Sequence, residues 1–249
     1  LGLLEDLRLH VSLGASLFQR VFGYRPVGVW PAEQAVNAYV LSAFAAEGFT
    51  WTVTDETLLV RAGLDPSDPS VGLRAWYASF NGTRLYVLFR NTQLSNLISF
   101  QYSSWDPKQA AQDLLNRLLD LAKRSDGTGI VVIALDGENP WEHYQEFGDT
   151  FLEALYAGLS DLQSKGLIIT TTPREYLAAH AQSARELPAK RYKYLDLAGR
   201  DISDLPASFT EDAYAQLPRR EVLAQIPEGS WSGGELATWI GQRQENAAW

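Results

Sequence analysis

Apolar residues recur every three or four positions in five segments of this chain, a spacing typical of amphipathic helices. A proline stands at the expected first turn of three of them, at Pro31, Pro107 and Pro173, where its fixed φ fits a helix start. The predicted helices span about residues 5–22, 31–47, 106–122, 150–164 and 172–180.

Short apolar runs between these segments predict strands, and the continuous run Ile130–Leu135 is the clearest. Strands that alternate with helices over short connections favour parallel pairing with helical crossovers, so the predicted class is α/β. The pattern weakens after about residue 183, which predicts a core of residues 1–182 and an extension of residues 183–249 that packs on it. The predicted strands are Val27–Trp30, Phe49–Thr54, Leu85–Phe89, Ile130–Leu135 and Leu167–Thr170.

Composition excludes several classes of function. The 249 residues are 46% apolar and 20% charged, and no apolar run approaches the roughly 18 residues that predict a membrane span. A net charge of −9 means that the chain has no excess of basic residues to bind the phosphate backbone of nucleic acid. The absence of cysteine excludes disulfides and thiolate metal sites but leaves the compartment open. Because the chain starts at Leu1 and contains no methionine, we expect it to be a processed or excerpted segment.

Charged residues follow the predicted strands directly. In parallel α/β folds the ligand site lies at the carboxyl ends of the strands, so these side chains are expected on one face. Each one singly has an ordinary explanation, since polar residues are common in loops and Glu33 could complement a helix N-terminus. The residues concerned are Glu33, Asp55, Glu56, Arg90, Asp136 and Glu138.

Glu33 and Asp136 form the best-placed pair of carboxylates. Each follows a predicted strand and has a tryptophan close by in sequence, Trp30 and Trp141. Glycoside hydrolysis needs one carboxylate at the anomeric carbon and a second, with a raised pKa, to protonate the leaving oxygen.

At these residues the chain resembles glycoside hydrolase family 57. The segment Gly28–Glu33 is similar to that family's nucleophile motif, and Leu135–Glu142 is similar to the motif that holds its acid/base aspartate. The form of the motifs is closest to the amylopullulanase-like branch. Further similarity covers most of the chain, in Trp51–Glu56, Phe89–Asn91, Leu94–Ser95, Phe151–Leu152, Leu155–Tyr156, Gly229–Trp231 and Trp239–Gly241.

The resemblance implies an incomplete, seven-stranded (β/α) barrel followed by helical or irregular segments, and a retaining reaction on α-glucans without cofactor or metal. Glu33 would be the nucleophile and Asp136 the general acid/base, with carboxyl groups about 5 to 5.5 Å apart. Asp55, Glu56, Arg90 and Glu138 would support their charge states, and Trp30, Trp141, Trp231 and Trp239 would contact substrate. Arg90 is expected to pair with one of the carboxylates, since an unpaired buried guanidinium is costly.

One departure from the family concerns its early His-Gln-Pro motif, which has no counterpart here. The histidines are His10, His143 and His180, and none precedes Gln-Pro. We therefore expect the chain to be the C-terminal portion of a catalytic region, with Val27–Trp30 paired on one side only and an upstream segment or a partner chain completing the barrel. Polysaccharide deacetylases, which share a related barrel, need an aspartate with two histidines around a metal, a set not found here.

A rival prediction is a non-catalytic glucan-binding or regulatory protein that keeps the carboxylate motifs but lacks the early strands. Neither linkage specificity nor the balance of hydrolysis and transfer follows from these motifs.

Overall fold

The computed structural model describes residues 2–138, 140–192, 222–227 and 229–231, and they belong to two compact units. Unit 1 comprises residues 1–63, 76–87 and 186–249, and unit 2 comprises residues 64–75 and 88–185. In chain order the elements are α1 Gly2–Phe22, β1 Gly28–Val29, η1 Ala32–Gln34, α2 Ala38–Ala46, β2 Trp51–Asp55, α3 Thr57–Arg61, α4 Pro69–Gly72, β3 Trp76–Phe80, β4 Thr83–Arg90, α5 Thr92–Asn96, η2 Leu97–Gln101, η3 Tyr102–Ser104, α6 Pro107–Arg124, η4 Trp141–His143, η5 Gln145–Gly148, α7 Asp149–Ser164, α8 Pro173–His180, η6 Ala181–Ser183, β5 Arg185–Glu186, β6 Lys190–Tyr192 and β7 Val222–Ala224.

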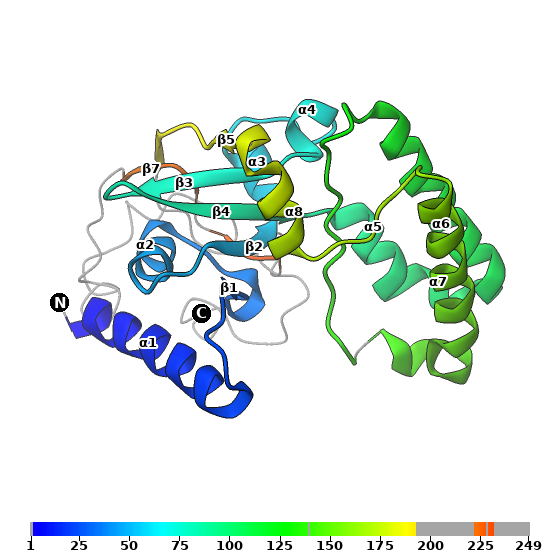
Figure 1. Ribbon diagram of the computed structural model, residues 1–249, viewed down its shortest axis with the longest axis horizontal. Coiled ribbons are helices and arrows are strands. Elements are labelled where there is room, and N and C mark those ends of the chain that lie inside the picture. The colour runs from blue at the N-terminus through cyan, green and yellow to red at the C-terminus, as the bar shows by residue number, and fades with distance from the viewer. Residues whose placement is uncertain (1, 139, 193–221, 228, 232–249) are drawn as a thin grey trace, which may run out of the picture. The chain divides into compact units, whose positions relative to one another are not determined.

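A five-stranded sheet with the order β1-β2-β4-β3-β5 forms the centre of the fold (Figure 1). The fold is α/β and the sheet is mixed and mostly parallel, as in an incomplete (β/α) barrel. β1 runs parallel to β2, with Gly28 opposite Trp51, and among the described residues it has no other neighbour.

The strand predictions missed β3, which forms an antiparallel hairpin with the predicted strand β4. Phe80 pairs with Thr83 across Asn81-Gly82, and both turn residues have positive φ, 49° and 83°. Asn-Gly is the strongest short-range sequence signal for such a turn. The expected mostly parallel pairing is confirmed, and the β3–β4 pair is the antiparallel part of the sheet.

Two predicted strands are not strands. The run Ile130–Leu135 makes only an isolated bridge, between Val132 and Arg90, because loops and side chains take its backbone groups. The Ser95 hydroxyl accepts from the Ala134 N–H at 3.2 Å, and Arg90 Nε donates to the Ala134 carbonyl at 2.7 Å.

Leu167–Thr170 is likewise extended without a strand partner among the described residues. The Gln163 side chain accepts from the Thr170 N–H at 3.0 Å, in place of a neighbouring strand. The sheet that contains β1 has five strands, the number expected, but β3 and β5 stand in place of the last two predicted strands.

The segment after Pro31 also differs from prediction. A helix was expected to run from Pro31, whereas the chain makes the short turn η1 and starts α2 only after Asn37, whose side chain accepts from the backbone N–H groups of Tyr39 and Val40. Glu33 therefore lies in a turn of its own.

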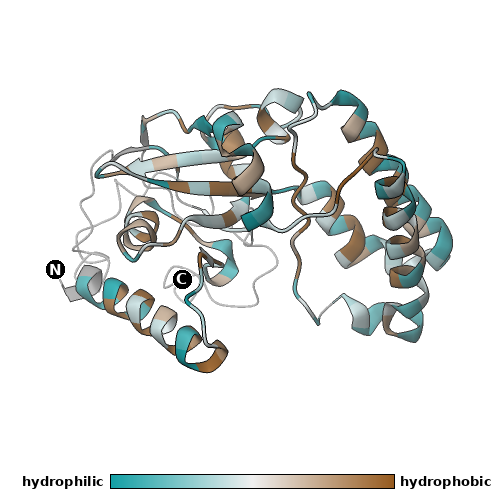
Figure 2. Ribbon diagram, viewed as in Figure 1, coloured by the Kyte–Doolittle hydropathy of each residue, from teal (hydrophilic) through white to brown (hydrophobic). Residues whose placement is uncertain are grey.

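Helix α1, in which apolar and polar residues alternate along the ribbon (Figure 2), confirms the first predicted helix, but much of its apolar side is exposed. Ala15 is buried, whereas Leu9, Leu13, Leu17 and Val21 are exposed. Amphipathic spacing predicted the helix correctly and did not predict which face packs. None of the described helices is long and apolar enough to cross a membrane.

Unit 2 has a helical core in which α6 packs against α7. Asp106 caps α6 by accepting from the Gln109 N–H at 2.9 Å, and Pro107 occupies the first turn, as predicted. Leu114 and Phe151 are fully buried within this core.

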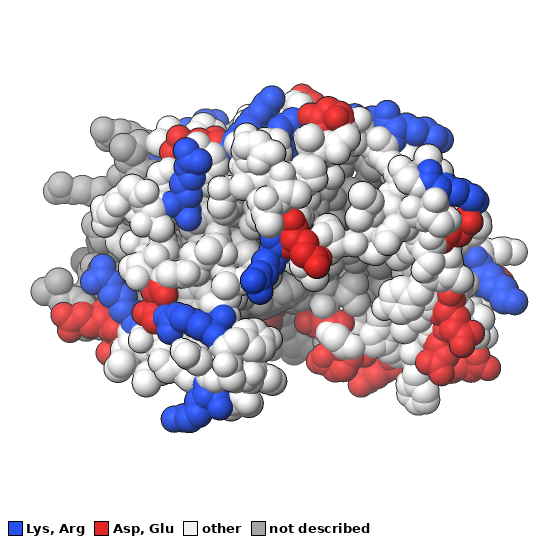
Figure 3. Space-filling model, in the orientation of Figure 1, with Lys and Arg blue, Asp and Glu red and all other residues white. Residues whose placement is uncertain are grey.

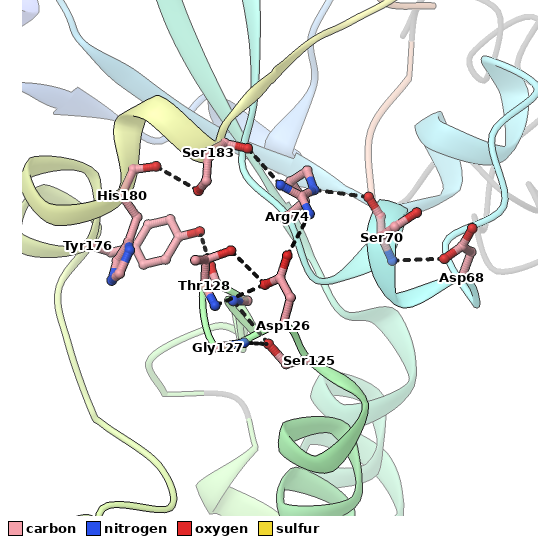
Figure 4. A network of polar contacts seen from close by, with 11 residues as sticks. Asp68, Ser70, Arg74, Ser125, Asp126, Gly127, Thr128, Tyr176, His180 and Ser183 are labelled. Carbon is pink, nitrogen blue, oxygen red and sulfur yellow. Dashed lines mark hydrogen bonds and ion pairs between the residues drawn. The ribbon is translucent and has the colours of Figure 1, made fainter.

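A polar network in unit 2 is built around the Arg74 guanidinium (Figure 4). Its nitrogens donate to the Ser70 carbonyl at 3.1 Å, the Ser183 carbonyl at 2.8 Å and Asp126 Oδ2 at 3.1 Å. The Tyr176 hydroxyl donates to the Thr128 carbonyl at 2.8 Å. The network joins three chain segments that are far apart in sequence.

The predicted extension, residues 183–249, lies mostly outside the described residues. Its described part contributes β5 to the sheet and pairs β6 with β7 in an antiparallel two-stranded sheet. The division at residue 183 stays a prediction.

Candidate active-site residues

Glu33 lies in a turn whose backbone is left-handed at two successive non-glycine residues. Glu33 has φ 52° and ψ 23°, and Gln34 has φ 52°. The turn closes through hydrogen bonds from the Gln34 N–H to the Pro31 carbonyl at 2.9 Å and from the Ala35 N–H to the Ala32 carbonyl at 2.8 Å. Each left-handed residue costs about 1–2 kcal/mol, so the surrounding structure must hold the turn.

Gln34 anchors this turn to the end of β2. Its carbonyl accepts from the Thr54 hydroxyl at 2.8 Å, and its side chain is 0% exposed. Within the described part of the chain, neither the amide nitrogen nor the amide oxygen of that side chain has a hydrogen-bond partner. Such a buried amide costs about 1–3 kcal/mol, so the turn is held at the expense of stability.

Two tryptophans lie beside the Glu33 carboxylate. The Trp231 indole N–H donates to Glu33 Oε2 at 2.6 Å, and the Trp231 backbone N–H donates to the Glu33 carbonyl at 3.2 Å. Trp30 meets Trp231 edge to face, with ring centroids 5.4 Å apart, and is 47% exposed. The predicted residues Trp30, Glu33 and Trp231 therefore form one cluster in unit 1, with the carboxylate itself exposed.

Asp55 and Glu56, at the end of β2, also belong to unit 1. Asp55 is 1% exposed, and its Oδ1 accepts from the Thr57 N–H at 3.0 Å at the start of α3. Glu56 is half-buried. This geometry gives Asp55 a part in fixing the end of β2.

Arg90 ends β4 and holds the segment that leads to Asp136. Its side chain is buried, at 5% exposed. Besides its bond to the Ala134 carbonyl, it donates from Nη2 to Asn96 Oδ1 at 2.7 Å. Asp136 and Glu138 follow this segment and are exposed. Arg90 is thus not a solvent-facing surface residue, and its pairing with a carboxylate stays a prediction.

Trp141 stabilises the loop after Asp136. Its indole N–H donates to the Gly137 carbonyl at 3.0 Å, and its ring lies 5.3 Å from that of Tyr144 and 6.4 Å from that of Phe151. Much of its surface is therefore committed to the core of unit 2. Of the predicted tryptophans, Trp239 lies outside the described residues.

The described residues hold no group of three or more histidine, cysteine or carboxylate side chains suited to a metal ion. His10 and His143 are exposed, and His180 lies against the Tyr176 ring at 5.1 Å. Figure 3 shows acidic side chains gathered over the part of unit 2 that carries η4, η5 and α7, where Glu142, Glu146, Asp149 and Glu153 are exposed.

Two residues near the candidate carboxylates escaped the sequence analysis. Gln34 follows Glu33 directly, and Ser95 contacts the segment before Asp136 through its hydroxyl. Ser95 stood within a quoted motif, but no pattern of apolar residues marks a buried amide beside a turn.

These observations define an α/β protein with a carboxylate at the carboxyl end of a parallel strand pair. The sequence model of Glycosyl hydrolase family 57 matches residues 1–191, and the chain belongs to that family. The amylopullulanase-like branch stays a prediction.

Among solved structures, the crystal structure of 4-alpha-glucanotransferase from Thermococcus litoralis is similar, with a TM-score of 0.55 and 20% sequence identity. The match covers 83% of this chain and 30% of that chain, so this chain spans less than a third of the length of the other. No curated protein sequence matches this chain.

Proposed function

We propose that the protein is a retaining glycoside hydrolase or transglycosylase acting on α-glucans, with Glu33 as nucleophile and Asp136 as general acid/base. The observation that carries the proposal is the Glu33 turn, a family 57 motif in which an exposed carboxylate is held on left-handed backbone by contacts from two other segments. Strained backbone of this kind clusters at active sites.

The chemistry assigned to the pair follows from the two-step mechanism of retaining enzymes. Glu33 attacks the anomeric carbon while Asp136 protonates the leaving oxygen, which gives a covalent glycosyl-enzyme. Asp136 then takes a proton from water or from an acceptor hydroxyl, and that oxygen displaces Glu33. The similarity to the 4-alpha-glucanotransferase of Thermococcus litoralis supports α-glucan as the substrate and glycosyl transfer as an activity beside hydrolysis.

The remaining predicted residues receive supporting roles. Arg90 fixes the backbone at Ala134, two positions before Asp136. The Trp141 indole N–H bonds the carbonyl of Gly137, the residue directly after Asp136. Trp30, with nearly half of its surface exposed, is the tryptophan best suited to stack on a sugar ring, while Asp55, Glu56 and Glu138 would set the charge around the pair.

Trapping of the intermediate tests the proposal. Incubation with 5-fluoro-α-glucosyl fluoride followed by peptide mass spectrometry should place the label on Glu33, and product analysis by NMR should give the α anomer from maltooligosaccharides. Azide should rescue Glu33→Ala with formation of a β-glucosyl azide, and Asp136→Ala with formation of the α-azide.

Binding of amylose or pullulan without label or turnover would instead support the rival, a non-catalytic glucan-binding protein. Turnover with inversion, or a label on another carboxylate, would overturn the assignment of Glu33. A structure in which the two carboxyl groups lie well beyond about 10 Å apart would exclude a retaining pair.

A further inference from the structure

Trp231 contacts Glu33 at two places, although 198 positions separate them in the sequence. The indole N–H reaches the carboxylate at 2.6 Å, and the backbone N–H reaches the carbonyl of the same residue at 3.2 Å. One residue therefore fixes both the backbone and the side chain of the carboxylate.

The segment that carries Trp231 is itself docked against the turn. Gly229 and Val36 exchange backbone hydrogen bonds in both directions, at 2.9 and 3.1 Å, as an antiparallel bridge. A Cβ on Gly229 would lie 2.8 Å from Leu58 Cδ1 and 3.0 Å from Arg61 Nη1. Glycine thus allows residues 229–231 to approach α3 closely enough to bring the indole to Glu33.

The chemistry of the contact selects one carboxylate oxygen. An indole N–H is a donor only, and a hydrogen bond from such a donor to a carboxylate oxygen is among the stronger kinds. The indole N–H holds Oε2, and this contact restrains rotation of the carboxylate about the Cγ–Cδ bond of Glu33. Oε1 is therefore the oxygen that is left to attack the anomeric carbon.

We propose that Trp231 is the positioning residue for Glu33, while the exposed Trp30 that meets it edge to face provides the sugar-stacking surface. This inference rests on the proposed function, since it assigns the contact a part in the attack of Glu33. It differs from the expectation that both tryptophans contact substrate in the same way.

A spectroscopic experiment tests the contact without any need for turnover. In the full chain with ¹⁵N-labelled indoles, the Trp231 resonance, assigned by its loss in Trp231→Phe, should lie downfield and exchange slowly with solvent. Glu33→Ala should move it upfield. The Trp141 indole, which donates to the Gly137 carbonyl, is the internal control and should stay in place. A Trp231 indole resonance whose chemical shift is the same in Glu33→Ala would overturn the inference.

A kinetic experiment tests what the contact does. Replacement of Trp231 by 3-benzothienylalanine, which keeps the ring shape and removes only the N–H, should slow labelling of Glu33 by 5-fluoro-α-glucosyl fluoride. The expected loss is about 10- to 100-fold in kcat, as for loss of one hydrogen bond to a charged group, with KM unchanged. Trp30→Ala should instead raise KM.

The two failures can be told apart. Labelling of Glu33 at an unchanged rate in the benzothienyl protein would overturn the positioning role and leave the nucleophile in place. Absence of any Glu33 label in the unsubstituted protein would overturn the proposed function, and with it the part of Trp231 in attack.

Discussion

The Glu33 turn of unit 1 and the Arg74 network of unit 2 both join chain segments that are distant in sequence, but they treat polar groups differently. Around Arg74, each guanidinium nitrogen has an acceptor, and the left-handed position nearby is Gly127, with φ 85°. Around Glu33, the left-handed positions carry side chains, and the buried Gln34 amide has no hydrogen-bond partner among the residues that the structure describes.

The difference distinguishes a network that stabilises the fold, around Arg74, from a candidate functional site, at Glu33. The Arg74 network follows the ordinary rules of stability, with glycine where φ is positive and a partner for each buried polar group. The Glu33 turn departs from both rules beside an exposed carboxylate. Departures of this kind are expected where function rather than stability has selected the residues.

The largest expected effect belongs to Glu33→Gln. Loss of the proposed nucleophile should lower kcat on maltooligosaccharides by about 10³-fold or more, while the melting temperature should change by less than about 2 °C, because the side chain is exposed. Glu5→Gln, another exposed glutamate, is the matched control and should retain activity. Equal activity of the Glu33→Gln and Glu5→Gln variants would mean that the Glu33 turn is not a functional site.

Arg74→Ala should act on stability instead. It removes three hydrogen bonds from a side chain that is 13% exposed, so we expect a loss of about 2–4 kcal/mol in urea unfolding. Arg124→Ala, which removes an exposed bond to the Ser67 carbonyl, should cost less than about 1 kcal/mol. Similar losses of unfolding free energy in both variants would show that the Arg74 network has no particular role in stability.

Gln34→Met should raise stability. Methionine has nearly the shape of glutamine and buries no unpaired amide, so the free energy of unfolding should rise by about 1 kcal/mol. Gln163→Met is the control, because the Gln163 side chain accepts from Thr170 at both N–H and hydroxyl, and its loss should lower stability. A destabilised Gln34→Met protein would mean that the amide is needed where it lies.

The smallest effect is a pH dependence at Asp126. Hydrogen bonds from the Thr128 hydroxyl and N–H, with the Arg74 guanidinium beside them, lower the pKa of Asp126 from 3.8 to about 2. A carboxylate whose pKa is lower in the folded state contributes stability above about pH 3.8 that is lost as the pH falls toward 2. The melting temperature of the unsubstituted protein should therefore fall more between pH 5 and pH 2 than that of Asp126→Asn.

The control for this titration is Asp120→Asn, which removes an exposed ion pair with Lys123. If Asp120→Asn reduces the fall in melting temperature between pH 5 and pH 2 as much as Asp126→Asn does, the effect is not specific to the Arg74 network.

Local sequence determined several features by itself. Helices α1, α6 and α7, and strands β1, β2 and β4, follow from apolar spacing, and Asp106-Pro107 marks the start of α6. Family membership also followed from local motifs, since Glu33 and Asp136 each stand in one. These features rest on contacts or preferences within a few residues of each other.

Other features required the tertiary structure. Ile130–Leu135 has the composition of a buried strand, but beyond the isolated bridge at Val132 the side chains of Ser95 and Arg90 take the backbone groups of Ala134, so no ladder continues among the described residues. Composition reports that a segment is buried and extended, whereas strand pairing depends on which partner reaches its hydrogen-bonding groups.

The surroundings of Glu33 show the same limit. The motif predicted the carboxylate, but not the contacts around it. Thr54 bonds Gln34 from 20 positions away, and Trp231 bonds Glu33 from 198 positions away. A single sequence read locally contains the residues of such contacts without their pairing, because the free energy that holds a strained turn comes from packing between distant segments.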